Sequence, residues 1–265
     1  MAIPRTIVVP LDGSKLAERA LPITGTLAER LGSDVVLVSA PWDEDRDAAE
    51  RYVQQVAAET SARVLETVVA DDQPPVDAIL AAVRDGPDRT VCMTTHGRGR
   101  FRWAMLGSVA EGVVSHSPEP VVLAGPRGRP EALRGSGRMV ICVDGSTTSE
   151  TIIPHACEWA NAMHLDVEVA FVVHPLDVED AEHPDAVLGP VADRVANEGL
   201  TAHPVLLRST YPAGALIDLA ESSPASLLAM TTHTRRGIAR AVLGSVTMGV
   251  VNSSPCPVLV TRPEA

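Results

Sequence analysis

Residues 93–121 read MTTHGRGRFRWAMLGSVAEGVVSHSPEPV, and residues 230–258 read MTTHTRRGIARAVLGSVTMGVVNSSPCPV. The two stretches lie 137 residues apart and are identical at 17 of their 29 positions. So long a period indicates duplicated domains, because solenoid repeats recur every ~20–50 residues. Toward the N-terminus of each copy, Val9-Pro-Leu-Asp-Gly-Ser14 returns as Ile141-Cys-Val-Asp-Gly-Ser146, at an offset of 132 residues. Each half of the chain is therefore expected to form a complete fold.

The length and composition fit two globular domains. The chain has 265 residues and a hydrophobic content of 45%, and domains usually contain ~100–150 residues. Residues 127–137 are rich in glycine, arginine and proline and poor in apolar side chains, which is typical of a flexible linker. We therefore expect a first domain over residues 1–126, a linker over 127–137 and a second domain over 138–265.

The composition argues against nucleic-acid and membrane partners. The net charge is −12 and the pI is near 5.1, whereas nucleic-acid binders usually carry a basic face. No apolar run approaches the ~20 residues that span a bilayer. Cys92, Cys142, Cys157 and Cys256 lack metal-ligand spacing, which favours buried reduced thiols over a metal site. The N-terminal stretch leads directly into a strand and does not resemble a signal peptide, so we expect a cytoplasmic protein.

Short β-branched runs bounded by turn residues recur along each half, and they are continuously apolar, as in parallel sheets covered on both faces. They span residues 6–9, 34–39, 62–69, 90–94 and 120–124, then 139–143, 167–173, 202–208, 226–230 and 257–260. Helices are expected over residues 17–31, 45–61, 75–85 and 108–116, with a bend at Pro22 and, in the second half, at Pro154. This alternation predicts an α/β fold of two tandem, doubly wound, Rossmann-like domains, each with a five-stranded parallel sheet.

Ligands of such sheets bind beyond the carboxyl ends of the strands, where the winding reverses. Asp12 follows the first strand and Ala40 the second. After the fourth strand, Gly97, nine further residues and Gly107 lead to a helix whose free N–H groups and partial positive charge suit an anion. Ser108 would cap this helix or donate to a phosphate oxygen. The segment is thus a phosphate cradle or an ordinary turn before a capped helix, and Asp12 is a ribose ligand or a turn residue.

Several motifs occur in the same order in both halves. In the first half they are Val9-Pro-Leu-Asp-Gly-Ser14, Met93-Thr-Thr-His-Gly-Arg-Gly99, Leu106-Gly-Ser-Val-Ala-Glu111 and Pro118-Glu-Pro-Val-Val-Leu123. They resemble the universal stress protein family, so the chain resembles a tandem member with adenine nucleotide alpha hydrolase-like domains. The resemblance implies a stress-response regulator that binds ATP, with or without Mg²⁺. It also implies that the halves pack as an intramolecular pseudo-dimer, and it leaves a homodimer of whole chains open.

The resemblance also implies where an adenine nucleotide would bind. The first site would comprise Pro10, Leu11, Asp12, Ala40, Met93, Gly97, Arg98, Gly107, Ser108, Val109 and Ala110. A second, weaker site would comprise Val143, Asp144, Val172, Met230, Thr234, Gly244, Ser245, Val246 and Thr247. Asp12 and Asp144 would contact the ribose, and Ala40 and Val172 the adenine. Residues 97–110 and 234–247 would contact the phosphates.

Both halves depart from the family's nucleotide motif, Gly-x2-Gly-x9-Gly followed by Ser or Thr. The first half reads Thr94-x2-Gly97-x9-Gly107-Ser108, and the second reads Thr231-x2-Thr234-x9-Gly244-Ser245. If the second motif position requires a positive φ, Thr234 would cost at least ~1–2 kcal/mol and its Cβ would crowd a phosphate. We therefore expect ATP to bind the first half more tightly than the second.

The sequence favours ligand binding over catalysis. It contains no GxxxxGK[ST] motif, so the lysine that Walker-type enzymes use on phosphates is missing. His96 and His233 lie beside the phosphate segments without a nucleophile at a suitable spacing, and we interpret them as loop or ligand contacts rather than general bases. The prediction is a nucleotide-binding regulator that is not an enzyme and holds no metal of its own. Two alternatives stay open, namely a slow ATP hydrolase or nucleotidyl transferase, and an interaction module without nucleotide.

Overall fold

The computed structural model describes residues 3–41, 45–96, 106–135, 137–176, 184–222, 225–232 and 243–263. The first half contains β1 (Thr6–Leu11), α1 (Ala20–Leu31), β2 (Asp34–Ser39), α2 (Arg46–Glu59), β3 (Val64–Val69), α3 (Pro75–Arg84), β4 (Arg89–Thr94), α4 (Ser108–His116) and β5 (Val121–Ala124). The second half contains β6 (Arg138–Val143), α5 (Ile153–Ala162), β7 (Asp166–Val173), α7 (Pro184–Asn197), β8 (Ala202–Arg208), α8 (Pro212–Ser222), β9 (Ala225–Thr231), α9 (Ser245–Ser253) and β10 (Val258–Thr261). Three 3-10 helices are η1 (Ala17–Arg19), η2 (Pro130–Leu133) and η3 (Ser149–Ile152). The predicted alternation of strand and helix is confirmed.

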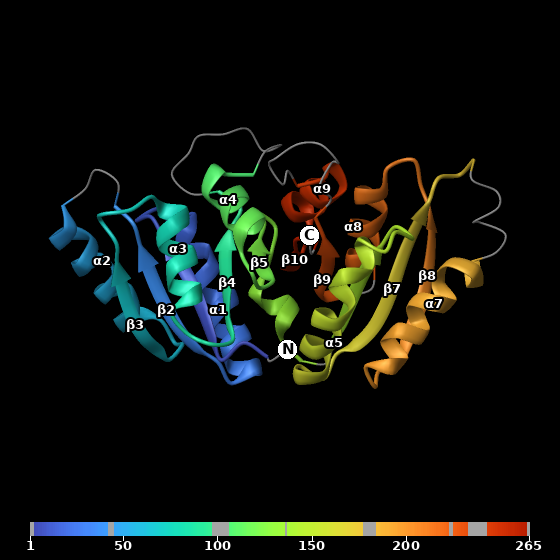
Figure 1. Ribbon diagram of the computed structural model, residues 1–265, viewed down its shortest axis with the longest axis horizontal. Helices are drawn as coiled ribbons and strands as arrows, with labels where there is room; N and C mark the ends of the chain where they lie inside the picture. Colours follow the sequence, from blue (N-terminus) through green and yellow to red (C-terminus); the bar gives the residue numbers. More distant parts are fainter. Residues whose placement is uncertain are drawn as a thin grey trace.

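The ten strands form one continuous sheet in the order β3-β2-β1-β4-β5-β10-β9-β6-β7-β8 (Figure 1). Within each half the neighbouring strands are parallel, and β1 lies between β2 and β4. The winding reverses at β1, so the half is doubly wound, as predicted. The halves meet where β5 pairs with β10 in antiparallel orientation, with Val122 opposite Leu259. The two predicted five-stranded sheets are therefore joined into one.

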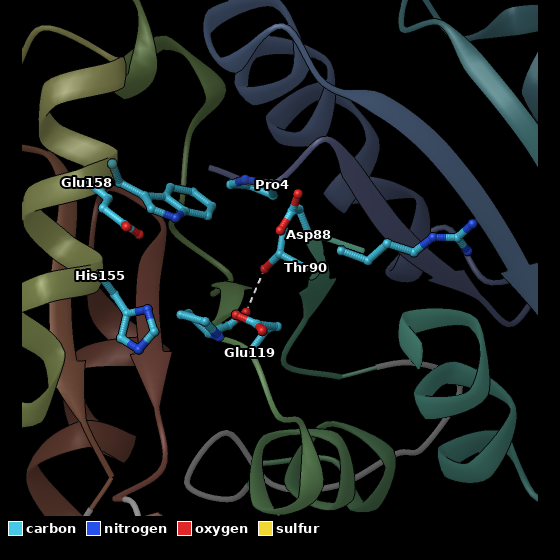
Figure 2. A pocket seen from close by; sticks show the side chains of 9 residues that line it. Pro4, Asp88, Thr90, Glu119, His155 and Glu158 are labelled. Atoms are coloured by element: carbon cyan, nitrogen blue, oxygen red, sulfur yellow. Dashed lines mark hydrogen bonds between the residues drawn. The ribbon is translucent and has the colours of Figure 1, made fainter. Parts of the chain in front are cut away.

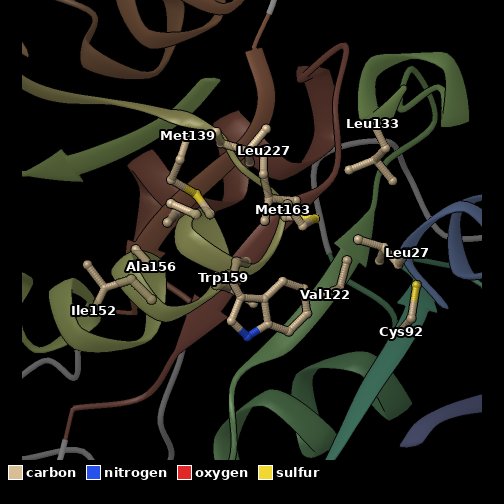
Figure 3. Close-up of a cluster of buried hydrophobic side chains, with 14 of the residues drawn as sticks. Leu27, Cys92, Val122, Leu133, Met139, Ile152, Ala156, Trp159, Met163 and Leu227 are labelled. Carbon is tan, nitrogen blue, oxygen red and sulfur yellow. The ribbon is translucent and has the colours of Figure 1, made fainter. Parts of the chain in front are cut away.

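Helices cover both faces of this sheet, and the buried side chains on one face form a single cluster across both halves. The cluster includes Leu27, Cys92, Val122 and Leu133 together with Met139, Ile152, Trp159, Met163 and Leu227 (Figure 3). The central strands are almost wholly buried, which explains their continuously apolar sequences. We call the boundary between the halves, along β5 and β10 and around η2 and α5, the seam. Because the cluster crosses the seam, burial of apolar surface stabilises the halves as a pair.

Pro22 and Pro154, where a bend was expected, lie next to a change of helix type rather than inside one uninterrupted α-helix. Both lie in the first turn of an α-helix, in α1 and α5, directly after the 3-10 helices η1 and η3. The first N–H groups of an α-helix have no partner within the helix, so a proline there removes no intrahelical hydrogen bond. The chain changes from a 3-10 helix to an α-helix before each proline.

Residues 127–137 also differ from the expected flexible linker. Leu133 of η2 is fully buried. Arg30 of α1 donates from Nη1 to the carbonyl oxygen of Leu133 at 2.6 Å, and from Nη2 to the carbonyl oxygen of Met163. Arg127 pairs with Glu221 of α8, with 2.6 Å between nitrogen and oxygen. The described part of the segment is therefore packed against both halves, through Leu133 and through polar contacts.

Candidate functional site

The described residues of the predicted first site lie at one edge of the sheet. β1, β2 and β4 are adjacent and end at Leu11, Ser39 and Thr94. The N-terminus of α4 lies at this edge, which is the upper edge in Figure 1. Open α/β sheets bind ligands at such an edge, next to the strand where the winding reverses.

Each described residue of the predicted site has a defined place there. Pro10 and Leu11 end β1, Asp12 follows it, Ala40 follows β2, Met93 lies near the end of β4, and Gly107, Ser108, Val109 and Ala110 start α4. Gly97 and Arg98 lie outside the described residues. Leu11, Met93 and Ala110 are buried, so their side chains belong to the core next to this edge and not to its surface. Asp12 and Ala40 are partly exposed and Ser108 is exposed.

Asp12 opens a tight turn. Its Oδ1 accepts a hydrogen bond from the backbone N–H of Ser14 at 3.0 Å, and Gly13 has a φ of +76°. The Oγ of Ser14 then accepts from the N–H of Ala17 at 3.1 Å, at the start of η1. The positive φ explains the glycine, since residues with a Cβ rarely adopt it. The turn and ribose interpretations of Asp12 are compatible, because a carboxylate has about four acceptor sites.

The start of α4 is set by contact with the end of β4. Gly107 is the N-cap residue, with φ −62° and ψ 145°, and its N–H donates to the carbonyl oxygen of Thr95 at 2.8 Å. A Cβ at Gly107 would lie 3.1 Å from that same oxygen, so close approach favours glycine here. Ser108 is the first helical residue and no side chain caps α4 among the described residues, so the interpretation of Ser108 as a cap is wrong. Such a terminus leaves its N–H groups to water or a ligand.

The second half repeats both features. Asp144 Oδ1 accepts from the N–H of Ser146 at 3.1 Å, Gly145 has a φ of +78°, and Gly244 is the N-cap of α9 with φ −60° and ψ 155°. Val143 ends β6, Val172 lies near the end of β7, Met230 lies near the end of β9, and Ser245, Val246 and Thr247 start α9. Thr234 lies outside the described residues. The two halves therefore share the same local backbone plan at this edge.

Larger side chains lie at the edge of the second half. Phe171 pairs with Val143 in the sheet, just as Ser39 pairs with Leu11 in the first half. A Cβ at Gly145 would lie 3.7 Å from the ring of Phe171 and 3.7 Å from a methyl group of Val187 in α7. These apolar groups therefore lie directly beside the turn that Asp144 opens. Sequence reasoning missed Phe171, although comparing the halves at their offset of 132 residues would have found the change from serine.

The two threonines at the first motif position have different partners. Thr231 is buried, and its Oγ1 donates to the carbonyl oxygen of Ser149 at 3.2 Å. The same atom lies 3.2 Å from Thr151 Oγ1 and 3.3 Å from Thr261 Oγ1. Thr94 Oγ1 instead donates to a carbonyl oxygen two residues further along its own loop, at 2.9 Å. Thr231 thus ties β9 to η3 and β10, whereas Thr94 makes only this local bond among the described residues.

His96 lies between the end of β4 and the start of α4. Its Nδ1 is 2.9 Å from the Oγ1 of Thr95, whose carbonyl oxygen accepts from Gly107. This contact agrees with the interpretation of His96 as a loop residue. His233 lies outside the described residues.

The described residues include no accessible thiol and no cluster of metal ligands. All four cysteines are buried and free, as predicted, and burial raises the pKa of the Cys92 and Cys142 thiols to about 12. They are therefore protonated and unreactive at neutral pH. No cluster of His, Cys, Asp and Glu side chains in the described ranges could hold a metal ion. None of the helices in these ranges is long and apolar enough to cross a membrane.

Known proteins resemble the chain at modest sequence identity. A universal stress protein of Mycolicibacterium smegmatis is 26% identical over 236 residues, which are 82% of this chain and 76% of that protein. A universal stress protein of Mycobacterium tuberculosis is 29% identical over 188 residues, 65% of this chain and 58% of that protein. The match therefore spans less than two thirds of that relative's length. The crystal structure of a universal stress protein from Archaeoglobus fulgidus has a TM-score of 0.72 at 20% identity, covering 97% of this chain and 98% of that one.

A family match covers nearly the whole chain. The model of the universal stress protein family matches residues 4–124 and again residues 135–262. Each match holds five parallel strands and a helix that opens after the fourth strand. The chain therefore belongs to the universal stress protein family and carries two of its domains in tandem.

Proposed function

We propose that the protein is an ATP-binding regulator of the stress response and that its first half holds the nucleotide. One observation carries the proposal, namely that the uncapped N-terminus of α4 and the Asp12 turn lie at the same sheet edge. The N–H groups and partial positive charge of the helix suit phosphate oxygens. The carboxylate of Asp12 suits the ribose hydroxyls, and Ala40 offers an apolar contact for the base. Gly97 and Arg98 complete the phosphate contacts in this proposal.

The second half is proposed to bind nucleotide weakly or not at all. Phe171 and Val187 lie beside the Asp144 turn, next to the proposed ribose contact. Thr231 is committed to hydrogen bonds with neighbouring elements, and Thr234 replaces a motif glycine. We therefore expect one nucleotide per chain. The proposed domains extend over residues 1–126 and 138–265.

The proposed action is binding without turnover. ATP, with or without Mg²⁺, would select one conformation or assembly of the protein, which requires tighter binding to that state than to its alternative. The support for an enzyme is limited to the carboxylate of Asp12 and the imidazole of His96, and no cluster of metal ligands lies among the described residues. The protein is accordingly proposed to act in the cytoplasm as an intramolecular pseudo-dimer, with no nucleic-acid or membrane partner.

Calorimetry with ATP on the full chain tests this function. The expected result is a single site per chain, together with adenine nucleotide released from the purified protein on denaturation. Phosphate release should stay far below the ~1–1,000 per second of ordinary enzymes. Two equal sites would contradict the closure of the second half. Absence of any binding would leave an interaction module, and release near one per second that is lost in Asp12→Asn would make the protein a hydrolase.

A further inference from the structure

A small pocket lies at the seam, at the amino ends of β4 and β5, which is the opposite sheet edge from the candidate nucleotide site. The first half contributes Pro4, Asp88, Arg89, Thr90, Glu119 and Pro120, and α5 of the second half contributes His155, Glu158 and Trp159. Figure 2 shows His155 and Glu158 on one side of the pocket, with Asp88, Thr90 and Glu119 on the other. Carboxylates from both halves therefore face one another across the seam.

The pocket disfavours the ionised form of Glu119. The residue is partly buried, and burial raises the pKa of Glu119, as do the negative charges of Asp88 and Glu158, whereas the positive charge of the N-terminal amino group has a smaller, lowering effect. The arginines of the pocket region are engaged with other groups. Arg5 pairs with Asp88 at 3.6 Å, and Arg89 donates to the carbonyl oxygen of Ala82 at 2.8 Å and lies 3.9 Å from Asp85.

The fold itself does not require charged groups at this place. At the corresponding positions of the opposite halves, Asp88 and Glu119 are replaced by Ala225 and Cys256, and His155, Glu158 and Trp159 by Ile23, Thr26 and Leu27. All five replacements are buried, with exposed fractions of 9% or less. On that side of the seam, η2 packs against α1 with Leu133 buried. Buried, mostly apolar side chains therefore fill the seam near α1 and η2, whereas acidic side chains line it near α5.

We propose that this pocket links the contact between the halves to protons, with Glu119 binding a proton on mild acidification and thereby tightening the seam. A neutral Glu119 is no longer repelled by Asp88 and Glu158, and its burial no longer opposes a charge. Trp159 connects the pocket to the core, because it lines the pocket and belongs to the cluster that crosses the seam. A change in the charge of Glu119 would therefore alter the surroundings of Trp159. His155 faces the same pocket, and a positive charge on its ring would attract the same carboxylates.

The direction of the effect follows from linkage. Because the pKa of Glu119 is higher in the folded chain than in the unfolded one, folding favours the protonated form. This contribution to the free energy of unfolding is absent above the folded-state pKa. It grows as the pH falls through that value and is complete below the unfolded pKa of about 4.3. Acidification from neutral pH therefore strengthens the seam through Glu119, whereas carboxylates with a lowered pKa weaken a fold on acidification.

Glu119→Gln tests the proposal in the full chain, because it removes the charge at nearly constant shape. The variant should melt about 2 °C above the wild type at pH 7 and at the same temperature near pH 4. In a Trp42→Phe, Trp103→Phe background, the fluorescence of Trp159 should change between these pH values when Glu119 is present, and it should stay constant when Glu119→Gln is added. Glu66→Gln is the control, since Glu66 is exposed on the edge strand β3, and it should alter neither difference.

Two further variants identify the proton-binding group. Glu158→Gln should lower the pH at which the fluorescence changes, because Glu119 then meets less repulsion, and this expectation holds even if Glu119→Gln does not fold. His155→Asn should leave a pH response in place. If the response survives in Glu119→Gln and disappears in His155→Asn, the histidine is the sensor and the assignment to Glu119 is wrong. The same pH response in the wild type and Glu119→Gln would also overturn it.

Discussion

Asp12 is the residue at which the nucleotide hypothesis can be tested with least disturbance of the fold. Asparagine keeps an Oδ1 that accepts the N–H of Ser14, so Asp12→Asn should preserve the turn. It removes the charge that strengthens hydrogen bonds from ribose hydroxyls. We expect ATP affinity to fall about tenfold, or ~1.4 kcal/mol, at an unchanged melting temperature. Titration calorimetry and thermal unfolding measure the two quantities.

Asp144→Asn is the matched control, because it makes the same change in the same turn of the second half. It should leave the affinity of the first site unaltered. An equal loss of affinity in both variants would show that the effect does not come from contact with the nucleotide.

At the level of single residues, the sequence indicates the place of the candidate site better than its details. Asp12 and Gly107 are found at the carboxyl edge of the sheet, as their positions after strands predicted. Of the two roles that the sequence left open for Ser108, the capping role is excluded because Gly107 is the N-cap of α4, and composition does not fix the backbone angles that decide a cap. Phe171 stands where the first half has Ser39, but a change of residue type alone does not indicate which groups the new side chain contacts. Its effect depends on its contact with Gly145, which sequence alone does not show.

The phosphate hypothesis depends on the position of the N-terminus of α4. In Gly107→Ala, the new Cβ would lie 3.1 Å from the carbonyl oxygen of Thr95, so the start of α4 or the end of β4 must shift slightly. We expect the free energy of unfolding to fall by about 1 kcal/mol and ATP affinity to fall severalfold, measured by chemical denaturation and calorimetry. Gly244→Ala at the start of α9 should leave the affinity unchanged. A destabilised Gly107→Ala variant with full affinity would remove α4 from the phosphate site.

The elements themselves could largely be predicted, because apolar runs and helical periodicity are local properties of the sequence. Their pairing across the seam could not. β5 and β10 have four residues each, and nothing in so short a strand indicates an antiparallel partner in the other half. The sequence pattern also could not show that Pro22 lies in the first turn of α1. The apolar residues of η1 and α1 follow one continuous helical spacing, which hides the boundary between the two helices.

At the scale of the whole molecule, a substitution at Leu133 tests whether the two halves unfold in a single cooperative transition. It is fully buried in η2 between them, so Leu133→Ala should lower the free energy of unfolding by about 2–5 kcal/mol. Circular dichroism and tryptophan fluorescence should report one shared transition. Leu65→Ala is the control, because Leu65 is 54% exposed, and it should change stability by less than about 0.5 kcal/mol. Two separate transitions would contradict a common core.

The pairing of β5 with β10 has a consequence for how the halves associate in the cell. Both strands belong to one polypeptide, so each meets its partner at an effective concentration on the order of millimolar, however dilute the protein is. A dimer of separate single-domain proteins would dissociate on dilution, whereas this pair does not. A half that is held in place in this way needs no ligand of its own to remain associated. A replacement such as Phe171, which stands where the first half has Ser39, can therefore persist in one half without separating the pair.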